Sequence, residues 1–122
     1  MAGEVAFFEI GVGDTDKGRA FYEGLFGWEW EIGPGSGWVM TTPNMQGGMH
    51  GGDLGAKPYV FFAVDDLDAA IERVHELGGG TEDIDGEGNE DSEARFGRFK
   101  ICHDDQGSWF GLHQPPTGAE PA

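Results

Sequence analysis

The chain has 122 residues, with 23 acidic against 7 basic side chains and a formal net charge of −16 at pH 7. This length suits one domain with a hydrophobic core. The negative charge repels phosphate backbones and anionic lipids, which argues against nucleic-acid and membrane partners. No segment approaches the roughly 20 apolar residues of a membrane span, and the N-terminus lacks a signal-peptide pattern, so we expect a cytoplasmic protein.

The first half of the chain predicts one strand, one helix and three further strands. VAFFEIGVGD (5–14) alternates between two kinds of side chain, as a strand with two different faces does. Asp14 then suits a helix N-cap, and Gly27 suits the helix end after an apolar i, i+4 stripe. Short alternating stretches at 28–32, 37–42 and 46–50 indicate the strands that follow.

The second half repeats this order. The pattern predicts a strand over 58–66 and a helix that begins after Asp66 and ends at the glycines 78–80. Polar residues 83–93 indicate a solvated, mobile loop, and residues 115–122 a flexible tail. Further short strands are predicted near 81–84, 96–102 and 108–113.

An internal repeat supports this reading. A shift of 52 residues places Asp14 on Asp66 and Gly27 on Gly79. Both pairs are helix-boundary residues, so the two halves share one structural plan.

The sequences GDTDKGRAFYEGLFGW (13–28) and VDDLDAAIERVHELGG (64–79), each preceded by a strand, resemble the vicinal oxygen chelate superfamily. This group includes glyoxalase I, extradiol dioxygenases and the bleomycin and fosfomycin resistance proteins. The resemblance implies an α+β fold in one domain, with two βαβββ modules at about 5–50 and 58–114. Their curved mixed sheets would surround a cavity, and two chains would form a homodimer.

The resemblance also identifies where metal-dependent members carry their ligands. Those positions are Phe7, Tyr59 and Gly111, with Gly48 as a less certain fourth. None offers the His, Glu or Gln that these members use. We therefore expect no cofactor and no metal at the usual family positions.

Strand alternation predicts a ligand pocket. One face of the predicted strands is uniformly aliphatic or Phe, whereas the other mixes aromatic rings, glycines, two histidines and one carboxylate. An apolar wall with a few polar groups is typical of a small-molecule site. The candidate ligand-binding residues are Phe7, Glu9, Trp38, His50, Tyr59, Phe61, Arg98, Trp109 and His113.

Glu9 is the central candidate, because a charged carboxylate is unusual in a strand of apolar and small residues. On a pocket face its pKa would rise, as in a catalytic general base, with His50 or His113 as the proton partner. A plain hydrogen bond to a neighbour is the structural alternative. A further alternative is a divalent Zn, Fe, Mn or Ni ion held by Glu9, His50 and His113.

Three functions follow from these residues. The leading hypothesis is a glyoxalase/bleomycin-resistance-like protein that binds a small organic molecule, aromatic or partly apolar, without the family metal. The second is an enzyme, either a lyase or isomerase that uses Glu9 with His50 or His113, or a metal-dependent, dioxygenase-like one. The third is an acidic module that docks a basic protein, supported only by the net charge.

Overall fold

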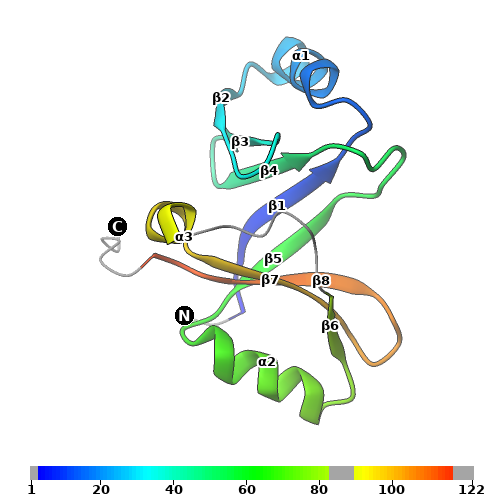
Figure 1. Cartoon of the computed structure of the whole chain (residues 1–122), viewed down its shortest axis with the longest axis vertical. Helices are drawn as coiled ribbons and strands as arrows, with labels where there is room; N and C mark the ends of the chain where they lie inside the picture. Colours follow the sequence, from blue (N-terminus) through cyan, green and yellow to red (C-terminus); the bar gives the residue numbers. More distant parts are fainter. Residues whose placement is uncertain (1–2, 83–89, 117–122) are drawn as a thin grey trace. The chain divides into compact units, whose positions relative to one another are not determined.

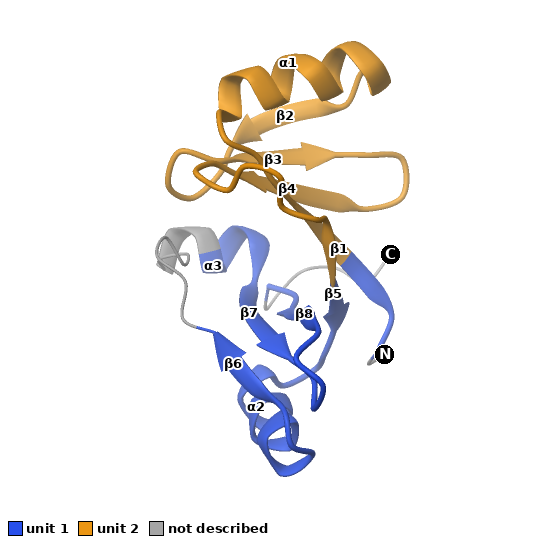
Figure 2. Ribbon diagram, turned by 90° about the vertical axis from the view of Figure 1, so that its right-hand side faces the viewer, with its two compact units in different colours: residues 1–6, 61–122 blue, residues 7–60 orange. Residues whose placement is uncertain are grey.

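The computed structural model describes residues 3–82 and 90–116. The chain divides into two compact units (Figure 2), one formed by Phe7–Val60 and the other by Met1–Ala6 together with Phe61–Ala122. The first strand therefore begins in one unit and continues in the other. Its N-terminal end is held by β-type hydrogen bonds, since Gly3 donates to the carbonyl of Ala63 and Ala63 donates to that of Glu4.

The unit of residues 7–60 contains one helix and a four-stranded sheet (Figure 1). Its strands follow the order β2-β3-β4-β1, in which β1 and β4 are parallel and the other pairs antiparallel. The elements are β1 (Val5–Gly11), α1 (Thr15–Phe26), β2 (Glu29–Ile32), β3 (Trp38–Thr41) and β4 (Gln46–His50).

The ends of α1 confirm the predicted caps. The side chain of Asp14 accepts hydrogen bonds from the backbone N–H groups of Asp16 and Lys17. Gly27 has φ 72°, and its N–H donates to the carbonyl of Glu23. A left-handed residue at this place is favourable for glycine because it has no Cβ.

The core of this unit lies between α1 and the sheet. Ile10, Met40 and Met49 are buried there. Gly18 in α1 passes close to the sheet, because a Cβ at this position would lie 2.8 Å from the Met49 sulfur. The predicted helix-side face of β1 is confirmed. The partly buried residues packed against this core are Phe8, Val12, Tyr22, Trp28, Trp30 and Trp38.

The second unit has the same plan with one added helix. Its sheet follows the order β5-β8-β7-β6, in which β5 and β8 are parallel and the other pairs antiparallel. The N-cap of α2 is Asp66, as predicted, and its side chain accepts from the N–H of Ala69. The elements are β5 (Tyr59–Ala63), α2 (Leu67–Glu76), β6 (Gly80–Glu82), α3 (Glu90–Phe96), β7 (Arg98–His103) and β8 (Trp109–Gln114).

The core of this second unit lies under α2. Leu67, Cys102 and Leu112 are buried there. Val64, Ile71 and Phe110 belong to the set that packs against them. Each unit therefore carries its helix on one sheet face, and the α+β class with two related modules is confirmed.

One prediction from the sequence is wrong. Helix α3 begins at Glu90, within the segment 83–93 that we expected to be a loop; residues 83–89 lie outside the described part of the chain. The helix stops at Gly97, which has φ 89° and donates to the carbonyl of Glu93. Several good helix formers in EDSEARF explain the helix despite the lack of an apolar stripe. The predicted tail falls largely on residues 117–122, which are also outside the described residues.

Among the described helices, none is long and apolar enough to cross a membrane.

Candidate functional site

The site is built on the face of the first unit's sheet that points away from α1. In the parallel pair β1 and β4, Glu9 lies opposite Gly48 and Gly11 lies opposite His50. Because side chains alternate along a strand, these four residues share one face. A Cβ on Gly48 would collide with Glu9 Oε1 and would lie 3.1 Å from the ring of Phe7. Glycine at this position therefore leaves the room that the carboxylate occupies.

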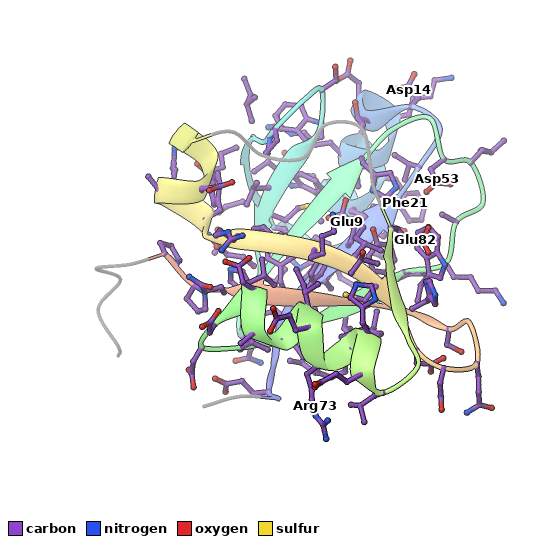
Figure 3. The ribbon with its side chains drawn as sticks, turned by 60° about the horizontal axis from the view of Figure 1, so that its bottom comes forward. Glu9, Asp14, Phe21, Asp53, Arg73 and Glu82 are labelled. Atoms are coloured by element: carbon purple, nitrogen blue, oxygen red, sulfur yellow. The ribbon has the colours of Figure 1, made fainter. Side chains whose placement is uncertain are left out.

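The Glu9 and His50 side chains meet diagonally across the two strands. His50 Nδ1 lies 2.6 Å from Glu9 Oε2. The other ring nitrogen, Nε2, lies 2.7 Å from Asp53 Oδ2 (Figure 3 labels Glu9 and Asp53). A carboxylate only accepts hydrogen bonds, so the ring satisfies both partners when it is protonated and donates from both nitrogens. We refer to Glu9, His50 and Asp53 as the carboxylate–imidazole chain.

Asp53 is the member of this chain that sequence reasoning missed. It lies three residues after His50, beyond the end of β4, and its N–H donates to the carbonyl of Val12 at 3.0 Å. Gly11 makes room for the contact, since a Cβ there would lie 2.8 Å from both His50 Nε2 and Asp53 Oδ2. The signal in the sequence was the spacing His50-x-x-Asp53, which brings two side chains together only when the loop turns back.

The electrostatics of the site follow from burial and from these two hydrogen bonds. Burial raises the pKa of Glu9, and the hydrogen bond from His50 opposes that rise. The hydrogen bond to Glu9, assisted by Asp53, raises the pKa of His50 to about 9 despite the opposing effect of burial. His50 is therefore an imidazolium at neutral pH. Tyr59 has a raised pKa through burial and the charges of Glu9 and Asp53, so its phenol stays neutral.

One oxygen of Glu9 has an open hydrogen-bonding position. Within the described residues, Oε2 accepts from His50, whereas no donor approaches Oε1. The Glu9 side chain is 15% exposed, and Oε1 is not among the fully buried polar atoms that lack a partner. Oε1 is thus a reachable acceptor on a largely buried carboxylate.

Trp38 does not share this face. It lies opposite Met49 in the β3–β4 pair, so its side chain is on the α1 side of the sheet. Its indole N–H donates to the carbonyl of Thr15 at 3.2 Å, and the Arg19 guanidinium lies 4.4 Å from its ring. These contacts give Trp38 a packing role between the sheet and the helix.

In the second unit, His113 lies in an aromatic cluster. Its ring stacks on Phe99 at a centroid distance of 4.3 Å, and Phe99 meets Phe61 edge-on at 5.3 Å. The Nε2–H of His113 donates to the carbonyl of Phe96 at the end of α3. Burial lowers the pKa of His113, which favours the neutral ring.

The remaining two candidates of this unit are more exposed. Arg98 forms an ion pair with Asp68 of α2, with Nη2 3.0 Å from Oδ1. It therefore lies on the helix side of the sheet, away from the Phe61 face. Trp109 is 51% exposed at the start of β8.

The side chains of the described residues are poorly arranged to bind a divalent metal ion. Among the described residues, no group of three or more His, Cys, Asp or Glu is arranged to hold a metal. In the carboxylate–imidazole chain, both ring nitrogens of His50 are used by carboxylates, which leaves no lone pair for a metal. At the family's ligand positions, the Phe7 ring is buried, and a Cβ on Gly111 would collide with the Phe61 ring.

Solved structures share this fold, although their sequences differ widely. A methylmalonyl-CoA epimerase from Mycobacterium tuberculosis is 20% identical, with a TM-score of 0.63 over 93% of this chain and 87% of that chain. A glyoxalase/bleomycin resistance protein/dioxygenase superfamily member from Vibrio splendidus is 16% identical, with a TM-score of 0.56 over 93% and 99%. A 2,2',3-trihydroxybiphenyl 1,2-dioxygenase from Sphingomonas wittichii is 13% identical, with a TM-score of 0.57 over 96% and 42%.

No protein-family model and no curated protein sequence matches the chain. The likeness is therefore one of structure, and the chain has the fold of the vicinal oxygen chelate superfamily, as its sequence motifs predicted. Members of one fold perform different chemistry, so function has to be argued from the site.

Proposed function

We propose that the protein binds a small organic molecule on the face of β1 and β4 that carries Glu9, with no metal at the usual family positions. The observation that carries this proposal is the reachable, unpartnered Oε1 atom of a largely buried carboxylate. A buried charge is costly unless it is paired, and Glu9 uses only one of its two oxygens on His50. A ligand donor at Oε1 would complete its hydrogen bonding.

The surroundings of Glu9 suit a molecule with an apolar or aromatic part. The Phe7 ring lies on the same face, next to Gly48, and Tyr59 is close enough for the Glu9 charge to raise its pKa. Tyr59 is only partly buried, and an aromatic ring offers contact area with a defined geometry. Binding without turnover would sequester the ligand. The homodimer and the cytoplasmic location remain predictions.

The test is a ligand screen by 15N–1H NMR, which reports on the backbone amides of β1 and β4. Aromatic metabolites and aromatic antibiotics are added to the wild-type chain and to Glu9→Gln. We expect saturable shifts at residues 7–11 and 46–50 that the variant weakens about tenfold, as for loss of a charged hydrogen bond. Silence across the panel, with folded protein, would refute the proposal.

A second candidate function is proton transfer, in a lyase or isomerase. The carboxylate–imidazole chain favours it, because His50 holds Glu9 in one orientation while burial raises the basicity of the carboxylate. Glu9 Oε1 would take a proton from substrate carbon and return it, and the resemblance to solved epimerases agrees with such a step. Deuterium exchange into carbon acids such as thioesters and hydroxyketones tests it, with His50→Gln as the comparison. Wild-type protein that binds a carbon acid without exchange would exclude this role.

A further inference from the structure

A second histidine–carboxylate pair lies in the second unit, between β6 and β7. His103 Nδ1 lies 2.7 Å from Glu82 Oε2 (Figure 3 labels Glu82). Antiparallel register places Gly80 opposite His103, and Glu82 has the same orientation two residues further along β6. Cys102, the neighbour of His103 on β7, is buried under α2. The pair therefore lies on the sheet face that points away from this helix.

Glu82 determines which ring nitrogen of His103 carries the proton. A carboxylate only accepts hydrogen bonds, so the nitrogen beside it, Nδ1, has to donate. In the neutral ring the other nitrogen, Nε2, is then an unprotonated acceptor. Within residues 3–82 and 90–116, no group is hydrogen-bonded to Nε2. The His103 side chain is 34% exposed, and Nε2 is not among the fully buried polar atoms that lack a partner, so solvent reaches this nitrogen.

The other three histidines do not have this arrangement. Both ring nitrogens of His50 are used by carboxylates. His113 is buried, and its Nε2 donates to the carbonyl of Phe96. His75 is exposed on α2, and no carboxylate of the described residues is paired with its ring. His103 differs from them because a carboxylate fixes one of its nitrogens and the other is open.

Gly80 provides the room for this ring. A Cβ at position 80 would lie 2.6 Å from His103 Cε1 and 2.7 Å from Nε2. The sequence predicted that the glycines 78–80 end α2, and Gly78, with φ 95°, fits that role. Gly80 has a different one, since it leaves no side chain of β6 against the open nitrogen at this point.

We propose that His103 and Glu82 form a second ligand site, in which His103 Nε2 accepts the proton of a phenolic hydroxyl group. The ligand is a neutral aromatic molecule whose O–H donates to Nε2. When the proton is transferred, the O–H bond breaks, its electron pair stays on the oxygen, and an N–H bond forms at Nε2. The products are a phenoxide and an imidazolium that still donates to Glu82. This site uses no residue of the Glu9 site, so it goes beyond the proposed function.

Nearby carboxylates stabilise the imidazolium that this transfer would form. Glu82 accepts its Nδ1–H, and a carboxylate in that position both orients the ring and balances the new charge. Hydrogen bonds from the N–H groups of Ser108 and Gln106 lower the pKa of Asp104. The positive charge of His103 contributes in the same direction, so Asp104 is a second carboxylate that senses this ring.

Other ligand classes suit this nitrogen less well. A carboxylate ligand has no proton to donate at neutral pH and is repelled by a chain with a net charge of −16. An ammonium ion forms stronger hydrogen bonds with carboxylates than with a neutral nitrogen, and the chain has 23 acidic residues. A neutral hydroxyl has neither disadvantage, and a phenol is a stronger acid than an aliphatic alcohol.

The first test is the protonation of the His103 ring, read by long-range 1H–15N NMR of the full chain at pH 8. We expect Nδ1 to be protonated and Nε2 to be unprotonated. Glu82→Gln should populate both tautomers, because an amide can either donate or accept. Glu72→Gln makes the same charge change on exposed α2 and should leave the tautomer as it is. A proton found on Nε2 of the wild-type ring would overturn the proposal.

The second test compares phenol with anisole, its methyl ether, which has no hydroxyl proton. Both probes are neutral at pH 8, and each is titrated into the full chain. We expect phenol to move the His103 Nε2 resonance saturably toward the value of a protonated nitrogen. We also expect phenol to bind about fivefold more tightly than anisole, as for one hydrogen bond. Equal binding of the two probes would show that Nε2 does not accept the hydroxyl.

Variants locate the phenol site, with the backbone amides of β6 and β7 as the readout. His103→Phe keeps an aromatic ring without a nitrogen and should reduce phenol binding to the level of anisole. Glu82→Gln should weaken it a few-fold, whereas Glu72→Gln should not change it. Phenol binding that is unchanged in His103→Phe refutes the inference. Because the Glu9 site is read at β1 and β4, failure here leaves that proposal standing, and the reverse also holds.

Discussion

His50 Nδ1 lies 2.6 Å from Glu9 Oε2, which joins the end of β4 to the middle of β1. These residues are 41 positions apart in the chain, and the parallel register of two strands brings them together. The contact gives the imidazole its charge and gives the carboxylate a fixed orientation. The pH behaviour of the protein should depend on it.

We expect stability to fall as the pH rises through the alkaline range. The pKa of His50 is about 9 in the folded chain, against an ordinary value near 6.5. A pKa raised by folding contributes stability that is fully present below about 6.5 and is lost as the pH rises through about 9. NMR titration of the His50 ring measures its pKa in the folded chain. Urea unfolding between pH 6 and 10 measures the loss of stability that should accompany deprotonation of this ring.

The matched variants for this prediction are Glu9→Gln and Glu72→Gln. The first removes the charged partner of His50, so the pKa of His50 should fall toward its ordinary value and the alkaline loss of stability should become smaller. The second should change neither property. A pKa of His50 that stays near 9 in Glu9→Gln contradicts the assignment.

Gly48→Ala should damage both the site and the fold. The new Cβ would occupy the place of Glu9 Oε1 and press on the Phe7 ring. Overpacking of this kind costs about 1–3 kcal/mol, and displacement of Glu9 should abolish ligand shifts at β1 and β4. Gly24→Ala is the control, because a Cβ there meets open space within α1 and should stabilise the helix by about 0.5–1 kcal/mol. Equal stability of the two variants would show that Gly48 is not needed for space.

The two N-caps should contribute alike, since they are equivalent in the two units. Asp14 and Asp66 each accept backbone hydrogen bonds at the start of a helix. Asp14→Ala and Asp66→Ala should each lower the free energy of unfolding by about 1 kcal/mol. Asp14→Asn and Asp66→Asn keep a side-chain acceptor and should lose little. Chemical denaturation measures all four variants, and an Asn variant as unstable as its Ala counterpart would argue against capping as the cause.

Met40 should be a major source of stability in the unit of residues 7–60. Its side chain is completely buried between the sheet and α1. Met40→Ala should cost about 2–5 kcal/mol through lost burial and the cavity that remains. Leu54→Ala, at a side chain that is 90% exposed, should be nearly neutral. Comparable midpoints of thermal unfolding for the two variants would place the core elsewhere.

Much of the local structure could be predicted from the sequence because it depends on neighbouring residues. The caps at Asp14 and Asp66 need only a short polar side chain before an apolar stripe. The strand alternation in β1 already separates Ile10 from Glu9, and the structure places Ile10 in the core under α1. Helix α3 was missed because it has no apolar periodicity, which is the signal that identifies most helices.

The sequence by itself determined that Glu9 lies on the face opposite the helix, since strand alternation is a property of the local backbone. Only the tertiary structure decided what Glu9 contacts. The β1–β4 register aligns it with His50, and the turn of the chain beyond β4 brings Asp53 to the other side of the ring. Long-range register sets these contacts, and alternation within one strand carries no information about register. The same reason explains why the sequence placed Trp38 among the ligand-binding candidates. Only its pairing with Met49 puts its side chain on the α1 side of the sheet.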